Sequence, residues 1–221
     1  MADDERAKAI GRRYGELAES SSDLSCGGAA GRACARPGET CLDLGSGRGG
    51  DVLRLAAAVG PSGFCWGVDV SDGMLERARR DAERLGVRNV GFLKSPLERI
   101  PLPDASVDVV VSDCAINHAA DKGAVWAEIA RVLRPGGRFV VSDIHALADV
   151  PEELRSDPRA VAECWAGAVR REVTLAAVRA AGLAGLEVLE ESAPYERGGI
   201  RIASMTLAGT KPGGGGRKGE E

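Results

Sequence analysis

The sequence predicts an α/β fold with a doubly wound, mostly parallel sheet covered by helices on both faces. Two observations predict it. Short apolar segments alternate with helical segments from residue 40 to residue 142, and the first apolar segment runs into a glycine-rich turn. A length of 221 residues with 44% hydrophobic content is also typical of one domain with one sizeable core.

Each element is predicted from its local pattern. The helix at 71–86 is the best defined, because Ser71 or Asp72 can cap its start and Gly86 follows its end. Apolar runs predict strands at 40–44, 64–70, 90–93, 107–112, 137–142, 186–191 and 200–207. The other expected helices cover 51–59, 122–133, 158–166 and 174–181.

Composition and charge exclude several classes of protein. The net charge is −4, and lysine and arginine are scattered instead of forming a stripe, so we expect no nucleic-acid partner. No apolar run approaches the roughly 20 residues of a membrane span, and the charged start has no signal-like apolar region, so we expect a soluble cytoplasmic protein. Six cysteines then indicate reduced thiols with individual roles.

A glycine motif, LDLGSGRGGD at residues 42–51, predicts a cofactor site. Gly45 and Gly47 lie where a strand turns into a helix, so the backbone can approach a nucleotide-like ligand closely. The alternative is a plain strand–helix turn. Asp69 favours the cofactor, because an acid at the end of the second strand can bind both ribose hydroxyls. Gly45, Gly47 and Gly50 loosely meet the dinucleotide fingerprint, which keeps an NAD enzyme as an alternative at this point.

Two later segments distinguish these alternatives: SPLERIPLPDASVDVV at 95–110 and RVLRPGGRFVVSD at 131–143. With the glycine motif, they resemble the class I S-adenosylmethionine-dependent methyltransferases over about residues 38–143. The resemblance implies a Rossmann-like, seven-stranded, doubly wound sheet with its last strand antiparallel.

The same resemblance implies a set of cofactor-binding residues. Asp43, Gly45 and Gly47 would hold the methionine part of S-adenosylmethionine, and Asp69 would hold the ribose. The adenine would lie against Val70 and Leu97, with Glu98 at its amino group. The cofactor site is completed by residues at four further positions: Tyr14, Ser46, Met74 and Asp113.

Cys114 lies in VSDCAINH, residues 111–118, just after the fourth strand. In this fold the loop after that strand lies beside the reactive methyl, so Cys114 would touch the methyl acceptor. A thiol handles protons poorly at neutral pH, because its ordinary pKa is about 8.5. Direct methyl transfer from a sulfonium needs no protein nucleophile, which leaves a soft-ligand role as the better interpretation.

Two cysteine segments, VSDCAIN and ECWAGA, resemble the arsenite methyltransferases, where the two cysteines are also 50 residues apart. Cys26 in the segment LSCGGAAG answers to a third family cysteine, and RRYG at 12–15 resembles the family's opening. The resemblance implies that Cys26, Cys114 and Cys164 form the catalytic arsenic site. This chain departs from the pattern at Asp113, which replaces an asparagine, and at His118, which replaces an apolar residue.

The chemistry agrees with this resemblance. Three thiolates can hold trivalent arsenic, which is soft, and its lone pair is then the nucleophile, so no general base is required. Transfer leaves pentavalent arsenic, and turnover then requires a thiol reductant such as glutathione or thioredoxin. The expected role is arsenic detoxification.

Two alternatives remain open. One is a methyltransferase for a small organic acceptor such as a quinone, and the other is a non-catalytic thiol protein that binds metalloids. We expect Cys34, Cys41 and Cys65 to pack as small apolar residues, and His118 and His145 to be loop or capping residues.

The chain is expected to be a monomer organised in four parts. These are an N-terminal segment with the cofactor lid (1–37), the cofactor-binding core (38–150), a C-terminal part that completes the sheet and arsenic site (151–210) and a disordered tail (211–221).

Overall fold

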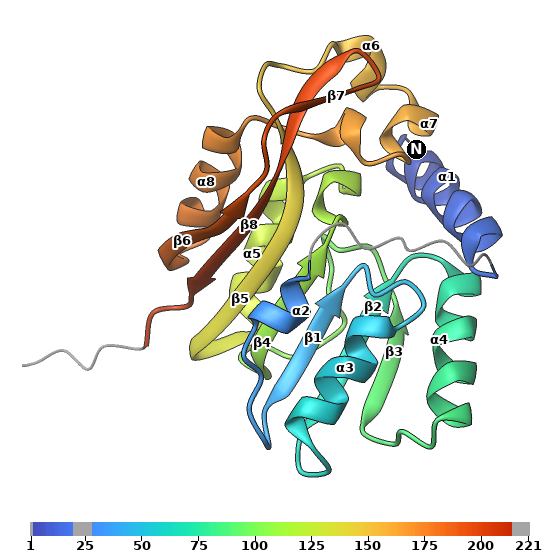
Figure 1. Ribbon diagram of the computed structural model, residues 1–221, viewed down its shortest axis with the longest axis vertical. Coiled ribbons are helices and arrows are strands. Elements are labelled where there is room, and N and C mark those ends of the chain that lie inside the picture. Colours follow the sequence, from blue (N-terminus) through green and yellow to red (C-terminus); the bar gives the residue numbers. More distant parts are fainter. Residues whose placement is uncertain (1, 20–27, 214–221) are drawn as a thin grey trace, which may run out of the picture.

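One twisted sheet organises the fold, with strands in the order β3-β2-β1-β4-β5-β8-β6 (Figure 1). The structure is a computed structural model that describes residues 2–19 and 28–213. Its strands are β1 (Thr40–Leu44), β2 (Phe64–Asp69), β3 (Val90–Lys94), β4 (Val107–Asp113), β5 (Leu133–Ala146), β6 (Ala184–Glu191), β7 (Tyr195–Arg197) and β8 (Ile200–Thr210).

The helices connect and cover these strands. They are α1 (Ala2–Leu17), α2 (Ala29–Arg32), α3 (Gly50–Val59), α4 (Asp72–Arg84), α5 (Lys122–Val132), α6 (Glu152–Arg155), α7 (Pro158–Val161) and α8 (Arg171–Ala180), with short 3-10 turns at Ile116–His118 and Trp165–Gly167.

The sheet confirms the predicted doubly wound topology. Strands β1 to β5 are mutually parallel, and β8 runs antiparallel to both of its neighbours, β5 and β6. The short strand β7 also pairs with β8, which adds one strand to the predicted seven. Because the order reverses between β1 and β4, the loops after these strands diverge at their carboxyl ends, which is where folds of this kind bind their ligands.

Two apolar layers cover the faces of the sheet. On one face Cys41 and Val109 pack with Val52 and Leu55 of α3. On the other face Leu42 and Val110 pack with Trp126 and Ile129 of α5, and α8 lies against α5 (Figure 1). The alternation of Cys41 and Leu42 between faces follows from the two-residue period of a strand.

Local signals explain where the helices begin. Ser71 caps α4, because its Oγ accepts a hydrogen bond from the Met74 backbone N–H at 3.4 Å. Asp121 caps α5 in the same way, through the Ala124 N–H at 3.0 Å. Both caps fix the loop that precedes the helix, and these loops carry the candidate site.

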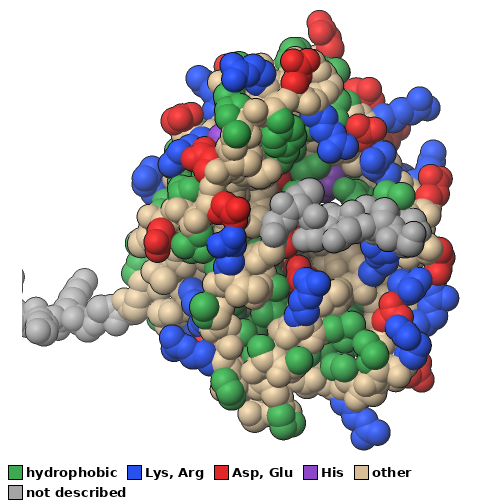
Figure 2. Space-filling view, viewed as in Figure 1, with side chains coloured by type: hydrophobic (Ala, Val, Ile, Leu, Met, Phe, Trp, Pro, Cys, Tyr) green, Lys and Arg blue, Asp and Glu red, His purple; other side chains and the backbone are tan. Residues whose placement is uncertain are grey.

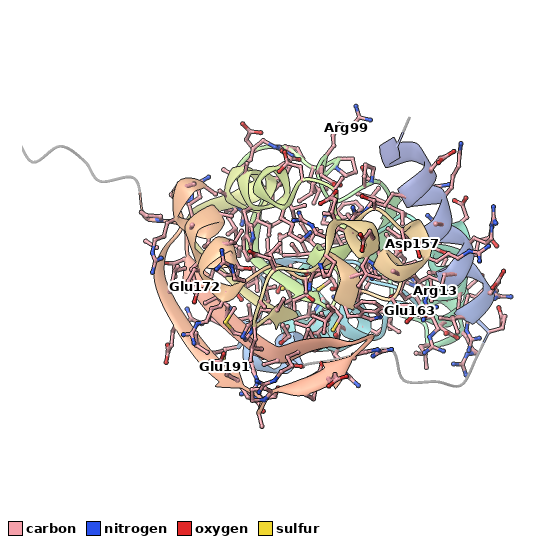
Figure 3. All side chains as sticks on the ribbon, turned by 90° about the horizontal axis from the view of Figure 1, so that it is seen from above. Arg13, Arg99, Asp157, Glu163, Glu172 and Glu191 are labelled. Carbon is pink, nitrogen blue, oxygen red and sulfur yellow. The ribbon has the colours of Figure 1, made fainter. Side chains whose placement is uncertain are left out.

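Two regions differ from the predictions. Residues 2–17 form α1, which the sequence pattern did not predict, and this helix packs against α4 and α7. The predicted helix 158–166 is wrong, because α7 ends at Val161 and the backbone breaks at Cys164, where φ is 75°. Arg13 of α1 and Glu163 lie side by side at 3.5 Å and join these two regions (Figure 3).

The surface carries both charges in mixed order. On the face in Figure 2, lysine and arginine side chains are interspersed with aspartate and glutamate. Among the described residues, we find no helix with the length and apolar character needed to cross a membrane. Most of the tail that was predicted to be disordered, residues 214–221, lies outside the described residues.

Candidate active site

The glycine loop follows β1 and is fixed to the neighbouring strand. The backbone N–H groups of Gly45 and Ser46 both donate to the Val68 carbonyl, at 2.8 and 3.0 Å. Gly45 has a φ of 72°, a conformation that side chains disfavour. A Cβ on Gly45 would also lie 2.2 Å from the Cβ of Ala115. The loop can therefore take this path only with glycine, and it touches the segment that begins at Cys114.

Asp69, at the end of β2, holds the two sides of the predicted cofactor site together. Its carboxylate accepts from the Gly47 N–H at 2.9 Å and from the Ser71 N–H at 2.8 Å. Burial raises the pKa of Asp69, although these hydrogen bonds oppose the shift. The carboxylate thus lies between the glycine loop and the start of α4, where the buried side chain of Met74 also faces Gly47.

The residues around the glycine loop fit S-adenosylmethionine. Among the described residues, Ser46 Oγ is buried and has no hydrogen-bond partner, so it is available to a ligand. A Cβ on Gly47 would meet only Met74 Sδ, at 4.0 Å, which leaves open space at this turn. Asp43 is buried beneath the loop, and burial together with the charges of Asp51 and Asp113 raises its pKa well above the usual value. A cationic sulfonium ligand would relieve that accumulation of negative charge.

The residues predicted for the adenine have other contacts in this structure. Glu98 accepts from the backbone N–H groups of Ala120 at 2.8 Å and Asp121 at 3.4 Å, so it fixes the approach to α5. Leu97 is buried and Val70 is half-buried. Their role toward the adenine stays a prediction.

The N-terminal helix lies over the end of β2. Ser71 Oγ donates to the Gly11 carbonyl of α1 at 3.3 Å, and Arg6 Nε donates to the His118 carbonyl at 2.8 Å. Tyr14 contacts His118 edge to face, with 3.0 Å between its hydroxyl and Nε2. These contacts hold Tyr14 against the turn that follows β4, and its predicted role as a cofactor lid stays a prediction.

His118 lies half-buried in the 3-10 turn of the loop after β4, as predicted for a loop residue. Its Nδ1 lies 3.0 Å from the Val161 carbonyl, which can only accept, so Nδ1 carries the proton. Burial lowers the pKa of His118 to about 4, and its unprotonated Nε2 therefore accepts from the Tyr14 hydroxyl. Burial likewise raises the pKa of Tyr14 to about 12, so the hydroxyl keeps its proton. This neutral pair joins α1 to α7.

Cys114 and Cys164 meet at the carboxyl edge of the sheet, as the sequence predicted. Their sulfur atoms and a carboxylate oxygen of Asp143 lie within 4.8 Å of one another. Both cysteines are buried in an apolar cluster with Ile144 and Trp165. Cys26, the third predicted ligand, lies outside the described residues.

Asp143, which the sequence analysis did not single out, forms the polar side of this cluster. It lies in β5, one residue after the last pair with β4, and its Oδ1 lies 3.6 Å from Cys164 Sγ. The same carboxylate accepts from Asn117 Nδ2 at 2.7 Å and from the Ile144 N–H at 2.8 Å. Burial raises the pKa of Asp143 to about 6, while burial and the Asp143 charge raise the pKa of Cys164 well above its usual value. The resting Cys164 thiol is therefore protonated.

The backbone at both cysteines has an unusual conformation. Cys114 has a φ of 52° and Cys164 a φ of 75°, where residues other than glycine are uncommon. Cys34 and Ala105 share this property, so it is not confined to the site. In the turn that follows Cys164, Gly167 packs closely against Asn117. A Cβ on Gly167 would lie 2.0 Å from the Asn117 carbonyl oxygen.

The remaining predictions concern Asp113 and the three cysteines that were expected to pack as apolar residues. Asp113 accepts from the backbone of Gly28 and Ala29 at 3.1 to 3.3 Å, and so fixes the start of α2 beside Cys114. Cys41 and Cys65 are fully buried on adjacent strands, as predicted, whereas the prediction that Cys34 packs in the core is wrong, because it is exposed.

Comparison with known proteins agrees with this geometry. Residues 35–198 match the family described as methyltransferase domain. The arsenite methyltransferase of Halobacterium salinarum is 39% identical over 165 residues, which cover 75% of this chain and 42% of that protein. The arsenite methyltransferase of Mus musculus is 37% identical over 142 residues, which cover 59% of this chain and 38% of that protein. The chain thus spans about two fifths of the length of these relatives.

A solved structure is similar over nearly the whole chain. It is the crystal structure of an arsenic(III) S-adenosylmethionine methyltransferase from Chlamydomonas reinhardtii, with a TM-score of 0.76 and 29% identity. The alignment covers 97% of this chain and 75% of that one. This chain therefore belongs to the methyltransferase domain family, and its resemblance to the arsenite methyltransferases is confirmed in both sequence and fold.

Proposed function

We propose that this chain transfers methyl groups from S-adenosylmethionine to trivalent arsenic, namely arsenite and methylarsenite, held by Cys114, Cys164 and Cys26. The observation that carries the proposal is the position of Cys114 and Cys164. The sulfur atoms of Cys114 and Cys164 lie within 4.8 Å of each other, and the residue after Cys114 packs on Gly45 of the cofactor loop. A soft acceptor bound there would be next to the methyl donor. The names of the sequence relatives support the same substrate.

The reaction balances without a protein base. Each thiol that bonds to arsenous acid releases its proton with a hydroxide as water, so binding gives an arsenic–sulfur bond and no net proton. The arsenic lone pair then forms the arsenic–carbon bond while the carbon–sulfur bond of the sulfonium breaks. The sulfur keeps that electron pair and leaves as S-adenosylhomocysteine. The protein contributes mainly by positioning the two reactants.

Groups around Cys164 would hold the proposed arsenic site rigid. Asp143 contacts the Cys164 sulfur, and Asn117 binds Asp143 through its side-chain amide at 2.7 Å. Asn117 Nδ2 also donates to the Ile144 carbonyl at 2.7 Å. Because Asn117 follows Cys114 by three residues, this network joins the two thiol-bearing segments. It would limit how far the sulfur atoms separate when arsenic is absent.

The third thiol is supported by an anchor next to it. Asp113 precedes Cys114 and binds the backbone of Gly28 and Ala29, and Cys26 is two residues before Gly28 in the sequence. A third thiolate would complete the pyramidal coordination that trivalent arsenic takes.

Turnover requires a further reactant. Methyl transfer leaves the arsenic pentavalent, so we propose that a cellular thiol system, glutathione or thioredoxin, returns it to the trivalent state by a two-electron reduction. Arsenic detoxification by a cytoplasmic monomer is the matching physiological proposal.

The proposed cofactor contact can be tested at Asp69. Asp69→Ala removes the charged acceptor for the ribose hydroxyls, at a cost of about 1.5 to 3 kcal/mol per hydrogen bond in S-adenosylmethionine affinity. Titration calorimetry measures it, with Asp72→Ala on the exposed start of α4 as the matched control. Unchanged affinity would remove Asp69 from the site. A wild-type chain that binds no S-adenosylmethionine would instead favour the non-catalytic, metalloid-binding alternative.

The proposed acceptor can be tested at the thiols. A time course of methylated arsenic species, with S-adenosylmethionine and excess thiol, should fall to background for Cys114→Ser and Cys164→Ser. The folded state of each variant is checked by circular dichroism. Full arsenite turnover by either variant would contradict the arsenic proposal and favour the organic-acceptor alternative.

The three thiols should not be equivalent. A methylated arsenic has only two bonds left for sulfur, so one thiol becomes dispensable. We expect this to be Cys26, because Cys114 and Cys164 are anchored at the sheet edge by the Asp143 network. Cys26→Ser should therefore lose arsenite methylation and keep activity on methylarsenite. Loss of both activities would show that Cys26 is required at every step.

A further inference from the structure

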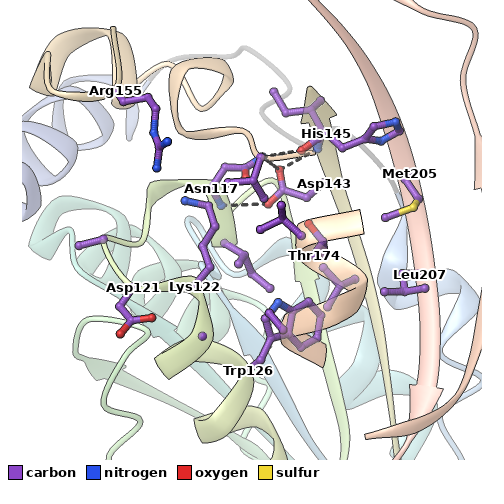
Figure 4. Close-up of a pocket in the computed structure, with 18 residues that line it drawn as sticks. Asn117, Asp121, Lys122, Trp126, Asp143, His145, Arg155, Thr174, Met205 and Leu207 are labelled. Carbon is purple, nitrogen blue, oxygen red and sulfur yellow. Dashed lines mark hydrogen bonds between the residues drawn. The ribbon is translucent and has the colours of Figure 1, made fainter. Parts of the chain in front are cut away.

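A cavity of about 450 Å³ lies on the α5 and α8 side of the sheet (Figure 4). Its apolar wall is formed by residues of α5, β5 and β8: Trp126, Val141, Met205 and Leu207. This volume is within the range of small-molecule sites. Cys114 and Cys164 are not among the residues that line it, so the cavity is separate from these two cysteines.

Two cations reach into the cavity from different elements. Lys122 extends from the start of α5, and Arg155 extends from the end of α6 toward the same space (Figure 4). Within the described part of the chain, the Arg155 guanidinium has no hydrogen bond or ion pair, and Lys122 Nζ contacts only the Ala119 carbonyl, at 3.3 Å. Arg155 is exposed, so this end is the entrance.

The two cations act on each other. Burial and repulsion by the Arg6 guanidinium lower the pKa of Lys122 to about 8, and Arg155 adds to the repulsion. The buried Asp143 carboxylate attracts Lys122 and opposes the shift. Asp121, whose carboxylate accepts from the Ala124 N–H at the start of α5, and Asp143 also line the cavity. An anion placed between Lys122 and Arg155 would stabilise the charged form of both cations.

The inner wall of the cavity disfavours an anion, whereas the entrance favours one. Asp143 lines the inner wall with a carboxylate, and Asn117 lines it with an amide whose two hydrogens are directed at Asp143 and at the Ile144 carbonyl. Both groups can only accept further hydrogen bonds, so this wall repels an anion. A ligand must then place its negative charge at the entrance and an uncharged body inside.

We infer that this cavity binds a small organic monocarboxylate, with the carboxylate between Lys122 and Arg155 and an apolar body against Trp126, Met205 and Leu207. The site is separate from the proposed arsenic site and does not depend on that function. A ligand in this cavity would lie beside Asp143, whose Oδ1 is 3.6 Å from Cys164 Sγ.

The test uses hydrocinnamate as the probe and hydrocinnamyl alcohol as its uncharged counterpart. Titration calorimetry should give saturable binding of the acid, and binding of the alcohol should be weaker by about ten-fold or more, because the alcohol lacks the charge. Lys122→Met and Arg155→Met should each weaken the acid by about five-fold or more and leave the alcohol unchanged. Ala177→Trp, which fills the cavity from α8, should remove both.

Two controls separate this inference from others. Arg99→Met changes an exposed arginine that does not line the cavity (Figure 3), and it should bind the acid as the wild type does. Cys164→Ser should also bind the acid normally even where methylation is lost. The inference is overturned if the acid does not bind, if the alcohol binds equally well, or if neither Lys122→Met nor Arg155→Met weakens the acid.

Discussion

Two pairs of buried cysteines lie close together among the described residues, and we propose only one of them as a ligand site. Cys41 and Cys65 are direct partners on the adjacent strands β1 and β2, and both are fully buried. Cys114 and Cys164 come from two loops 50 residues apart and are almost as deeply buried. Burial and proximity therefore do not distinguish a packed thiol from a ligand.

The surroundings make the difference. Around Cys41 and Cys65 the strand backbone is regular and the side-chain neighbours are apolar residues such as Val52 and Val109. A hydrogen bond with Cys65 and burial raise the pKa of Cys41, so this thiol stays protonated. Cys114 and Cys164 instead have left-handed backbone conformations, lie at the sheet edge, and share a carboxylate. Loop position and a polar neighbour therefore distinguish the pair that we propose as the arsenic site.

We call Cys114 and Cys164 the loop pair, and Cys41 and Cys65 the strand pair. The largest expected effect comes from disturbing the packing around the loop pair without changing either cysteine. Gly167→Ala would place a Cβ 2.0 Å from the Asn117 carbonyl oxygen, which must move. Because Asn117 holds Asp143, we expect arsenite methylation to fall by about a hundred-fold, the effect of a misplacement near 1 Å. The matched control is Gly31→Ala in α2, where a Cβ meets nothing within 4 Å and activity should be unchanged. Equal activity of the two variants would show that this packing does not position the thiols.

A second prediction concerns the carboxylate that only the loop pair has. The pKa of Asp143 is about 6 in the folded chain against an ordinary value of 3.8, so the folded state holds the proton more tightly. Its contribution to stability is full below pH 4 and is lost as the pH rises through 6.

The free energy of unfolding of the wild type, relative to Asp143→Asn, should therefore fall by about 2 kcal/mol between pH 4 and pH 7. Urea denaturation at a series of pH values measures it. A constant difference across this range would show that Asp143 titrates normally.

Substitutions in the strand pair should lower stability and leave methylation unchanged. Cys41→Ser and Cys65→Ser bury a hydroxyl among apolar side chains and should lower the free energy of unfolding by about 1 to 3 kcal/mol. Methylation by the folded fraction should stay at the wild-type level. An inactive but stably folded Cys41→Ser variant would end the distinction between the two pairs.

The smallest effect is expected at Cys34, which is exposed. Cys34→Ser should change the free energy of unfolding by less than about 0.5 kcal/mol and leave methylation intact. It serves as the reference for all serine variants, and a clear loss of either quantity would reveal a role that its exposure does not suggest.

Much of the sheet could be predicted from the sequence, because its signals are local. Strands β1 to β4 appear in the sequence as short apolar runs, and Ser71 is a residue type that favours the N-cap position of a helix such as α4. The cysteine loop could be placed because it directly follows β4. Residues 158–166 read as a helix from composition, but contacts far away in sequence break it, through Gly167 against Asn117.

The parts that could not be predicted depend on such distant contacts. Asp143 follows an ordinary strand sequence and gains its role only when Cys164 folds back onto it. Helix α1 has a charged sequence with glycines at positions 11 and 15, and these weaken the helical signal. In the structure Gly11 lies close to the Val70 carbonyl and Gly15 close to Ser71, so the glycines serve packing.

The central claim is that the loop pair, and not the strand pair, holds trivalent arsenic. X-ray absorption at the arsenic edge of the arsenite-loaded protein measures it directly, by counting sulfur neighbours of arsenic in the wild type and in Cys41→Ser, Cys65→Ser, Cys114→Ser and Cys164→Ser. We expect one sulfur neighbour fewer, or no bound arsenic, for Cys114→Ser and Cys164→Ser, and the wild-type count for Cys41→Ser and Cys65→Ser. A wild-type count in Cys114→Ser and Cys164→Ser would contradict the account.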